Sequence, residues 1–296
     1  MALIFLLYWL LIPYPVYALI DALGAELLGA FARWSILFTL RFLPPVLLYL
    51  LFVKRPAARV LSMAPLRLKT VLHIAFITVF VRQIEFLLEF GLPLVLGLDL
   101  PPMLQMSLPW THWAAGLVIA VLCKEFLFRG VLYSEYQNQG VSIGKTALVT
   151  GLFFGLVHTG IVGIAASAIL GILWAYLLYY TRSIWAPLLS HAIYNVLWQL
   201  HPFLLRNVAD LEAFLPTYLL IVGIATLGAA PVMIVFAKAF WAENRRETKG
   251  PAEESRAFTW SYWVLIAVML TVIAAASLVC ADGIAPPDFL CHIPTL

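Results

Sequence analysis

Residues 111–133 read THWAAGLVIAVLCKEFLFRGVLY, an apolar run that is interrupted by Lys124, Glu125 and Arg129. Residues 114–123 are apolar on every side, whereas a strand of a membrane β-barrel would alternate apolar and polar residues. About 20 apolar residues are enough for an α-helix to cross the hydrocarbon core of a bilayer. We therefore predict that this stretch is a membrane-spanning helix with charged side chains inside it.

The composition of the whole chain is that of a membrane protein. Its 296 residues are 64% hydrophobic and 11% charged, with a mean hydropathy of +0.98, whereas soluble chains average about 45–50% apolar and about 25% charged. We predict an all-α fold, a polytopic bundle of about eight or nine transmembrane helices. The candidate spans lie at roughly 3–20, 34–53, 70–97, 111–133, 142–158, 161–181, 183–205, 215–241 and 259–281.

The distribution of Lys and Arg predicts the orientation in the membrane. With nine spans and a cytoplasmic N-terminus, twelve of the 18 basic residues fall on the cytoplasmic side, and only Arg33 and Arg206 fall outside. The first span lacks the basic flank of a cleaved signal peptide, so we expect it to be retained. The charged segment 243–256 is then a cytoplasmic linker and the C-terminus lies outside. We expect a bacterial plasma membrane.

The charge pattern also indicates which classes of binding partner to expect. The net charge of +3 sits in loops that face anionic lipid, so the lipid bilayer is an expected partner. No basic stripe with interleaved aromatic residues lies outside the spans, and we therefore expect no nucleic-acid partner. The sequence leaves open the oligomeric state and whether Cys280 and Cys291 form a disulfide.

Charged and polar groups inside the spans are the functional candidates, because each central charge costs about 2.5–3.5 kcal/mol on insertion scales. Four cations face three carboxylates, a near balance that buried ion pairs would produce. Glu125 and Arg129 are four residues apart and share one helix face. The whole set is Arg41, Arg82, Glu85, Glu89, Lys124, Glu125, Arg129, His158, His191 and Asn195.

Three short motifs contain most of these groups. They are Lys124-Glu125-Phe126-Leu127-Phe128-Arg129-Gly130, Phe154-Gly155-Leu156-Val157-His158 and His191-Ala192-Ile193-Tyr194-Asn195. Together they resemble the CPBP family of type II CAAX prenyl endopeptidases and bacteriocin-processing (Abi-type) membrane proteins, over about residues 108–200. The resemblance implies a four-helix catalytic-type core, which we place at 108–205. The apolar spans predict about three transmembrane helices before it, in 1–107, and C-terminal transmembrane helices after it, in 206–296.

The resemblance implies an intramembrane endopeptidase of the glutamic type. A glutamate and His158 would activate water, His191 and Asn195 would stabilise the oxyanion, and Arg129 would pair with Glu125. The expected substrate is a membrane-embedded, prenylated or leader peptide, without a cofactor. A zinc site at Glu125, His158 and His191 is disfavoured because the ammonium of Lys124 would repel the metal. We expect the motif residues to converge on one polar cavity that opens toward the cytoplasm.

One position departs from the family pattern, which begins with two glutamates, because residue 124 is lysine. Three interpretations remain. Glu125, or an outside carboxylate such as Glu85 or Glu89, acts as the base; or Lys124, neutral through burial, is the base itself; or the chain has lost proteolysis and is a binding or scaffold protein. A transporter lined by the charged groups is a further alternative.

Helix geometry predicts where Lys124 points. Neighbouring side chains differ by about 100° around a helix, so Lys124 and Glu125 face different directions. If Glu125 pairs with Arg129, Lys124 takes the direction of the missing carboxylate, toward His158.

Small residues recur every four positions in two of the spans and predict close helix packing without a chemical role. They are Gly151 and Gly155 in one span and Gly163, Ser167, Gly171 and Ala175 in the next.

Overall fold

The computed structural model describes residues 30–53, 56–97, 115–158, 161–205 and 210–244, together with positions 8, 15, 18, 19 and 208. Within these residues the chain is helical, as predicted, and its only β-type pairing is an isolated bridge between Met63 and Ser183. Most of the predicted first span, all of the ninth span, Cys280, Cys291 and nearly all of the linker at 243–256 lie outside the described residues. The orientation of the chain therefore stays a prediction.

The described residues form thirteen helical segments. In chain order they are α3 (Ala30–Phe52), α4 (Ala57–Val60), α5 (Leu68–Phe86), η1 (Leu87–Gly91), α6 (Leu92–Leu96), η3 (Ala115–Ala120), α8 (Val121–Glu125), η4 (Phe126–Tyr133), α9 (Ser134–Asn138), α10 (Ile143–Leu156), α11 (Ile161–Thr181), α12 (Trp185–Leu205) and α13 (Leu211–Asn244). Segments η1, η3 and η4 are π-helical, and 115–138 run without a break through η3, α8, η4 and α9.

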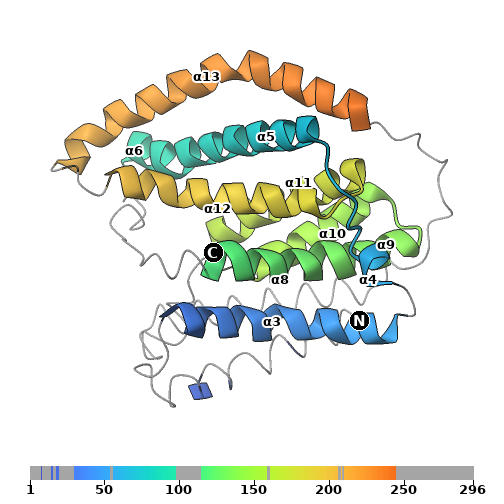
Figure 1. Cartoon of the computed structure of the whole chain (residues 1–296). Helices are drawn as coiled ribbons and strands as arrows, with labels where there is room; N and C mark the ends of the chain where they lie inside the picture. Colours follow the sequence, from blue (N-terminus) through green and yellow to red (C-terminus); the bar gives the residue numbers. More distant parts are fainter. Residues whose placement is uncertain are drawn as a thin grey trace.

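The helices stack in layers, as Figure 1 shows. The long and bent α13 covers one side of α5, and α12 packs against the other side. Next come α8, α10 and α11, and α3 packs on 115–138 as the outermost of the described helices on the opposite side. Pro216 and Pro231 lie inside α13, and proline inside a helix removes a backbone hydrogen bond and favours bending. The three motifs therefore lie in the interior layers.

Within the described residues, four helices are long and apolar enough to cross a membrane: Phe31–Phe52, Leu68–Leu96, Gly163–Thr181 and Ala213–Ala242. The apolar helix Ile143–Leu156 is shorter. A helical membrane bundle is thus confirmed, whereas the count of nine spans stays a prediction. The boundaries that apolarity predicted within the described residues agree with the helices to within about five residues.

The seam between α10 and α11 depends on glycine. A Cβ on Gly155 would lie 2.5 Å from the carbonyl oxygen of Ile164, and one on Gly171 would lie 2.8 Å from the Cα of Gly151. The predicted close packing is confirmed at these positions. Gly163 is different, because a Cβ there would meet nothing within 4 Å. The seam therefore follows the face that contains Gly171 and Ala168 instead of the face with Gly163.

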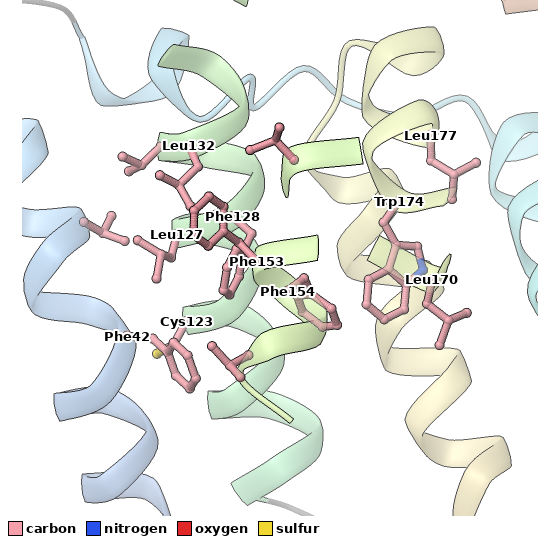
Figure 2. Packing of buried hydrophobic residues seen from close by; sticks show 14 of the residues in the cluster. Phe42, Cys123, Leu127, Phe128, Leu132, Phe153, Phe154, Leu170, Trp174 and Leu177 are labelled. Atoms are coloured by element: carbon pink, nitrogen blue, oxygen red, sulfur yellow. The ribbon is translucent and has the colours of Figure 1, made fainter. Parts of the chain in front are cut away.

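Aromatic side chains fill the space between the helices. Phe42 of α3 packs near Phe128 of η4, with ring centroids 6.5 Å apart, and Phe154 of α10 lies edge-on to Trp174 of α11 at 5.2 Å. Figure 2 shows these rings pointing from their helices into one common core. Buried aromatic rings contribute much of the apolar area that stabilises such a core. This packing brings the three motif helices together.

The start of α12 is held by the segment between α3 and α5. The backbone N–H of Ile184 donates to the carbonyl oxygen of Ser62 at 2.9 Å, and the hydroxyl of Ser183 donates to the carbonyl oxygen of Ala64. Ser62 and Arg182 have φ angles of 51° and 56°, in the left-handed region. The tight turn after α11 is thereby fixed against a second chain segment, which sets the register of the third motif.

Candidate active site

Glu125 lies at the centre of the motif residues. It is fully buried, and its Oε1 accepts a hydrogen bond from Arg129 Nη1 at 3.2 Å and one from His191 Nδ1 at 2.8 Å. The i,i+4 pair predicted from the sequence is therefore present. Arg129 also donates from Nη2 to the carbonyl oxygen of Gly171 at 2.9 Å. Motifs one and three thus meet at a single carboxylate oxygen.

Lys124 points in a different direction from Glu125, as predicted. Its Nζ lies 3.3 Å from His158 Nε2, and its side chain is only 3% exposed. The rings of Phe42 and Phe154 have their centroids 5.9 and 5.8 Å from the same Nζ. The position of the missing first glutamate is therefore occupied by a buried amine that contacts the histidine of the second motif.

The other ring nitrogen of His158 defines its tautomer. His158 Nδ1 is 2.8 Å from the carbonyl oxygen of Phe154, and because a carbonyl only accepts, Nδ1 must donate. In the neutral ring the lone pair is then on Nε2, which faces Lys124. The basic nitrogen of His158 is therefore engaged by Lys124.

Two aromatic rings separate and support the charged groups. Trp174 stacks on His191 with centroids 4.1 Å apart at 20°, and the guanidinium carbon of Arg129 lies 5.3 Å from the Trp174 centroid. The ring centroid of Phe154 lies 4.6 Å from the same guanidinium carbon. It also lies 5.0 Å from the ring centroid of His158 and 5.6 Å from that of His191. Both histidines thus lie on the same side of the bundle, around one ring.

We call Lys124, Glu125, Arg129, His158 and His191 the motif cluster. Each of these side chains is buried, with at most 8% exposed, so they fill the interior instead of lining a cavity open to the cytoplasm. This corrects the expectation of an open polar cavity, and the cause is the aromatic packing around the cluster.

Asn195, the sixth predicted site residue, differs from the motif cluster. It lies one turn beyond His191 on α12 and is half-buried. Among the residues that the structure describes, no hydrogen bond from its amide is found, so the structure does not join Asn195 to Glu125.

The outside carboxylates lie in a second group, which we call the α5 cluster: Arg82, Glu85, Glu89 and Tyr194. Arg82 is fully buried and lies 3.6 Å from Glu85 and 3.4 Å from Glu89, whose side chains are 23% and 20% exposed. Tyr194 of α12 hydrogen bonds to Glu85, and the centroid of its ring lies 5.6 Å from the guanidinium carbon of Arg82. Glu85 and Glu89 are thus paired with Arg82.

The expectation that the motif residues hold no metal ion stays a prediction. No group of three or more His, Cys, Asp and Glu side chains that could hold a metal ion occurs among the described residues. The histidine nearest to Glu125 donates to it, and the other histidine contacts an amine. These contacts suit proton transfer and charge stabilisation instead.

Several residues of the site were not predicted as such. Trp174 lies in an apolar helix without a motif, so the sequence gives no sign of its role. Its indole Nε1–H donates to Ser190 Oγ, which lies 2.7 Å from Thr78 Oγ1, and both of these are single hydroxyls in apolar spans. Gly171 was predicted only as a packing residue, yet its carbonyl oxygen accepts from Arg129. The one available signal for Ser190 was its position next to His191.

Comparison with known families gives one match. Residues 106–197, about a third of the chain, match the model of "Type II CAAX prenyl endopeptidase Rce1-like". No curated protein and no solved structure matches the chain. The apolar helices and this match identify an integral membrane protein. Residues 106–197 are therefore similar to the Rce1-like type II CAAX prenyl endopeptidases, the resemblance that the three motifs predicted.

Proposed function

We propose that the chain is a CAAX-type intramembrane endopeptidase of low intrinsic activity, in which Lys124 keeps the base His158 from activating water. The observation that carries the proposal is the 3.3 Å contact between Lys124 Nζ and His158 Nε2. The substrate class is a membrane-embedded, prenylated or leader peptide, which the family match supports.

Hydrolysis of a peptide bond needs a group that takes the proton of the attacking water. His158 has its Nδ1–H on the carbonyl oxygen of Phe154, so only Nε2 is available for that proton. The Nζ of Lys124 contacts this nitrogen, so water cannot donate to it. The ammonium of Lys124 cannot itself accept the proton of water. A carboxylate at position 124 would instead accept from water and hold it beside His158.

The remaining motif residues suit the stabilisation of negative charge. His191 donates from Nδ1 to Glu125 at 2.8 Å, which fixes the orientation of the imidazole ring. Asn195 is partly exposed, so its amide is available to a substrate carbonyl. Donors placed in this way contribute to hydrolysis once a base is available.

A second candidate function is hydrolysis with Glu125 as the base. It is favoured by the Oε2 of Glu125, which is buried and has no hydrogen-bond partner within the described residues. In that case Lys124 acts only as a nearby positive charge, and loss of the Glu125 carboxylate abolishes native cleavage.

The test is cleavage of a fluorogenic farnesylated CAAX peptide, and of its unprenylated form, by purified protein in liposomes. We expect slow cleavage by the native chain and a rise of about 10²–10⁴-fold in Lys124→Glu, the range that general-base catalysis contributes. Lys124→Gln is the matched control, because it removes the charge without adding a base. Adding His158→Ala to Lys124→Glu should abolish the gain.

Two results would overturn the proposal. One is native cleavage as fast as that of Lys124→Glu, and the other is an equal gain in Lys124→Gln and Lys124→Glu. Native cleavage that disappears in Glu125→Gln would favour the second candidate.

A further inference from the structure

A chain of hydrogen bonds joins Trp174 of α11 to α5 through α12. The indole Nε1–H of Trp174 donates to Ser190 Oγ at 2.9 Å, and Ser190 Oγ lies 2.7 Å from Thr78 Oγ1. The hydroxyl of Thr78 donates to the carbonyl oxygen of Ile74 at 2.7 Å. All three side chains are buried, with at most 2% exposed.

The direction of each bond follows from the number of protons. Thr78 has one hydroxyl proton, which goes to Ile74, so Ser190 must donate its own proton to Thr78. Ser190 then has a lone pair for the indole N–H of Trp174. Every proton in the chain has one acceptor, and the acceptor at its end is a backbone carbonyl of α5.

Trp174 is also the ring that supports the motif cluster. It stacks on the imidazole of His191 at 4.1 Å and 20°, and it is edge-on to Phe154 at 5.2 Å and 83°. A stacked ring limits the tilt of its neighbour, and the hydrogen bond at Nε1 fixes the rotation of the indole itself. The orientation of His191 toward Glu125 therefore depends on both contacts of Trp174.

We propose that Thr78 is a positioning residue for His191, acting through Ser190 and Trp174. Helix α5 lies outside the segment 106–197 that matches the family model, so it supplies a part of the site that the match does not include. The inference concerns the orientation of His191 and does not depend on the proposed hydrolysis.

Without the hydroxyl of Thr78, the hydroxyl of Ser190 loses its acceptor and turns to another one. A serine hydroxyl inside a helix readily donates to the carbonyl four residues earlier on its own helix. Once Ser190 turns to that carbonyl, its lone pair no longer faces Trp174. A buried N–H without an acceptor is costly, so the indole is expected to leave its position over His191.

The experiment uses the full-length protein in liposomes and measures acylation of histidine by diethylpyrocarbonate, with mass spectrometry of each modified site. His201 is an internal reference, because it lies on the same helix, is 3% exposed and stacks on Phe86 of α5 at 3.7 Å. The measured quantity is the rate at His191 divided by the rate at His201. Thr78→Val removes the hydroxyl with little change in shape, and Thr78→Ser retains the hydroxyl as the rescue variant.

We expect Thr78→Val to raise the ratio about fivefold or more, as the loss of one buried hydrogen bond allows. Trp174→Phe, which lacks the indole N–H, should raise it likewise, and Thr78→Ser should stay within about twofold of the native protein. An unchanged ratio in Thr78→Val would overturn the proposal. Equal increases at His191 and His201 would also overturn it, because they indicate a general loosening of α5 from α12. Neither result depends on peptide cleavage, so this proposal and the proposed function can fail independently of each other.

Discussion

The motif cluster and the α5 cluster are two buried groups of charge that differ in sign and in access. The motif cluster contains two basic side chains, Lys124 and Arg129, and one acidic side chain, Glu125. Every side chain in it is at most 8% exposed. In the α5 cluster, two carboxylates that are about one-fifth exposed share one fully buried Arg82. The near balance of charge along the sequence thus conceals a separation: positive charge is in excess at the sealed site, and negative charge is in excess at the accessible one.

The difference indicates what each cluster can tolerate. A buried charge that loses its partner leaves an uncompensated ion in a medium of low dielectric constant, whereas a partly exposed charge keeps some solvation or relaxes toward the surface. The sealed cluster should therefore be sensitive to every change of charge, and the α5 cluster should be tolerant.

The largest expected effect comes from removing the two arginines in turn. Arg129→Met leaves Glu125 buried without its i,i+4 partner, and we expect it to lower the free energy of unfolding by about 3–5 kcal/mol. Arg82→Met leaves two carboxylates that are 23% and 20% exposed, so its cost should be smaller, about 1–2 kcal/mol. Denaturant titration of the two variants in the same detergent measures the difference. Equal losses would remove the distinction between the clusters.

The next effect concerns the helix seam that closes the motif cluster. Gly155→Ala places a methyl group 2.5 Å from the backbone oxygen of Ile164, and overpacking of this kind costs about 1–3 kcal/mol. Gly163→Ala is the matched control on α11, since its methyl group meets nothing within 4 Å, and it should stabilise the helix by up to about 1 kcal/mol. Thermal unfolding of both variants checks the opposite signs. A loss of stability in Gly163→Ala as large as that in Gly155→Ala would contradict the described seam.

The smallest effect is expected from neutralising one carboxylate of the α5 cluster. Glu89→Gln reduces the excess negative charge and leaves Glu85 with Arg82, so the change in unfolding free energy should stay within about 0.5 kcal/mol. Glu125→Gln should cost several times more, because Arg129 then has no buried counter-ion. Both changes are isosteric, so the same unfolding assay isolates the effect of charge. A large loss in Glu89→Gln would mean that the α5 cluster is as constrained as the motif cluster.

Much of the fold could be predicted from the sequence, because the physics involved is local. A membrane span is a property of about 20 consecutive residues. Apolarity alone therefore predicted where α11 and α12 begin and end. The i,i+4 spacing likewise placed Glu125 with Arg129, and the 100° step between neighbours placed Lys124 apart from Glu125.

What could not be predicted depends on contacts between helices. Nothing in the spacing of Thr78, Trp174 and Ser190 indicates that they meet, because they lie on three helices whose packing is set by the whole core. The same holds for the seam, where the sequence pattern of small residues includes Gly163 but the contact face passes through Ala168. The burial of the motif cluster also depends on tertiary contacts, since it comes in part from Phe42 and Trp174, which lie outside the three motifs.

The central claim is that Lys124 occupies the basic nitrogen of His158, and through-space ¹⁵N–¹⁵N solid-state NMR in liposomes tests it most directly. In protein labelled at Lys and His, the account predicts a correlation between the Nζ of Lys124 and the Nε2 of His158, which lie 3.3 Å apart. Assignment follows from its loss in Lys124→Met and in His158→Ala. Absence of this correlation in native protein whose other Lys and His signals are intact would contradict the account.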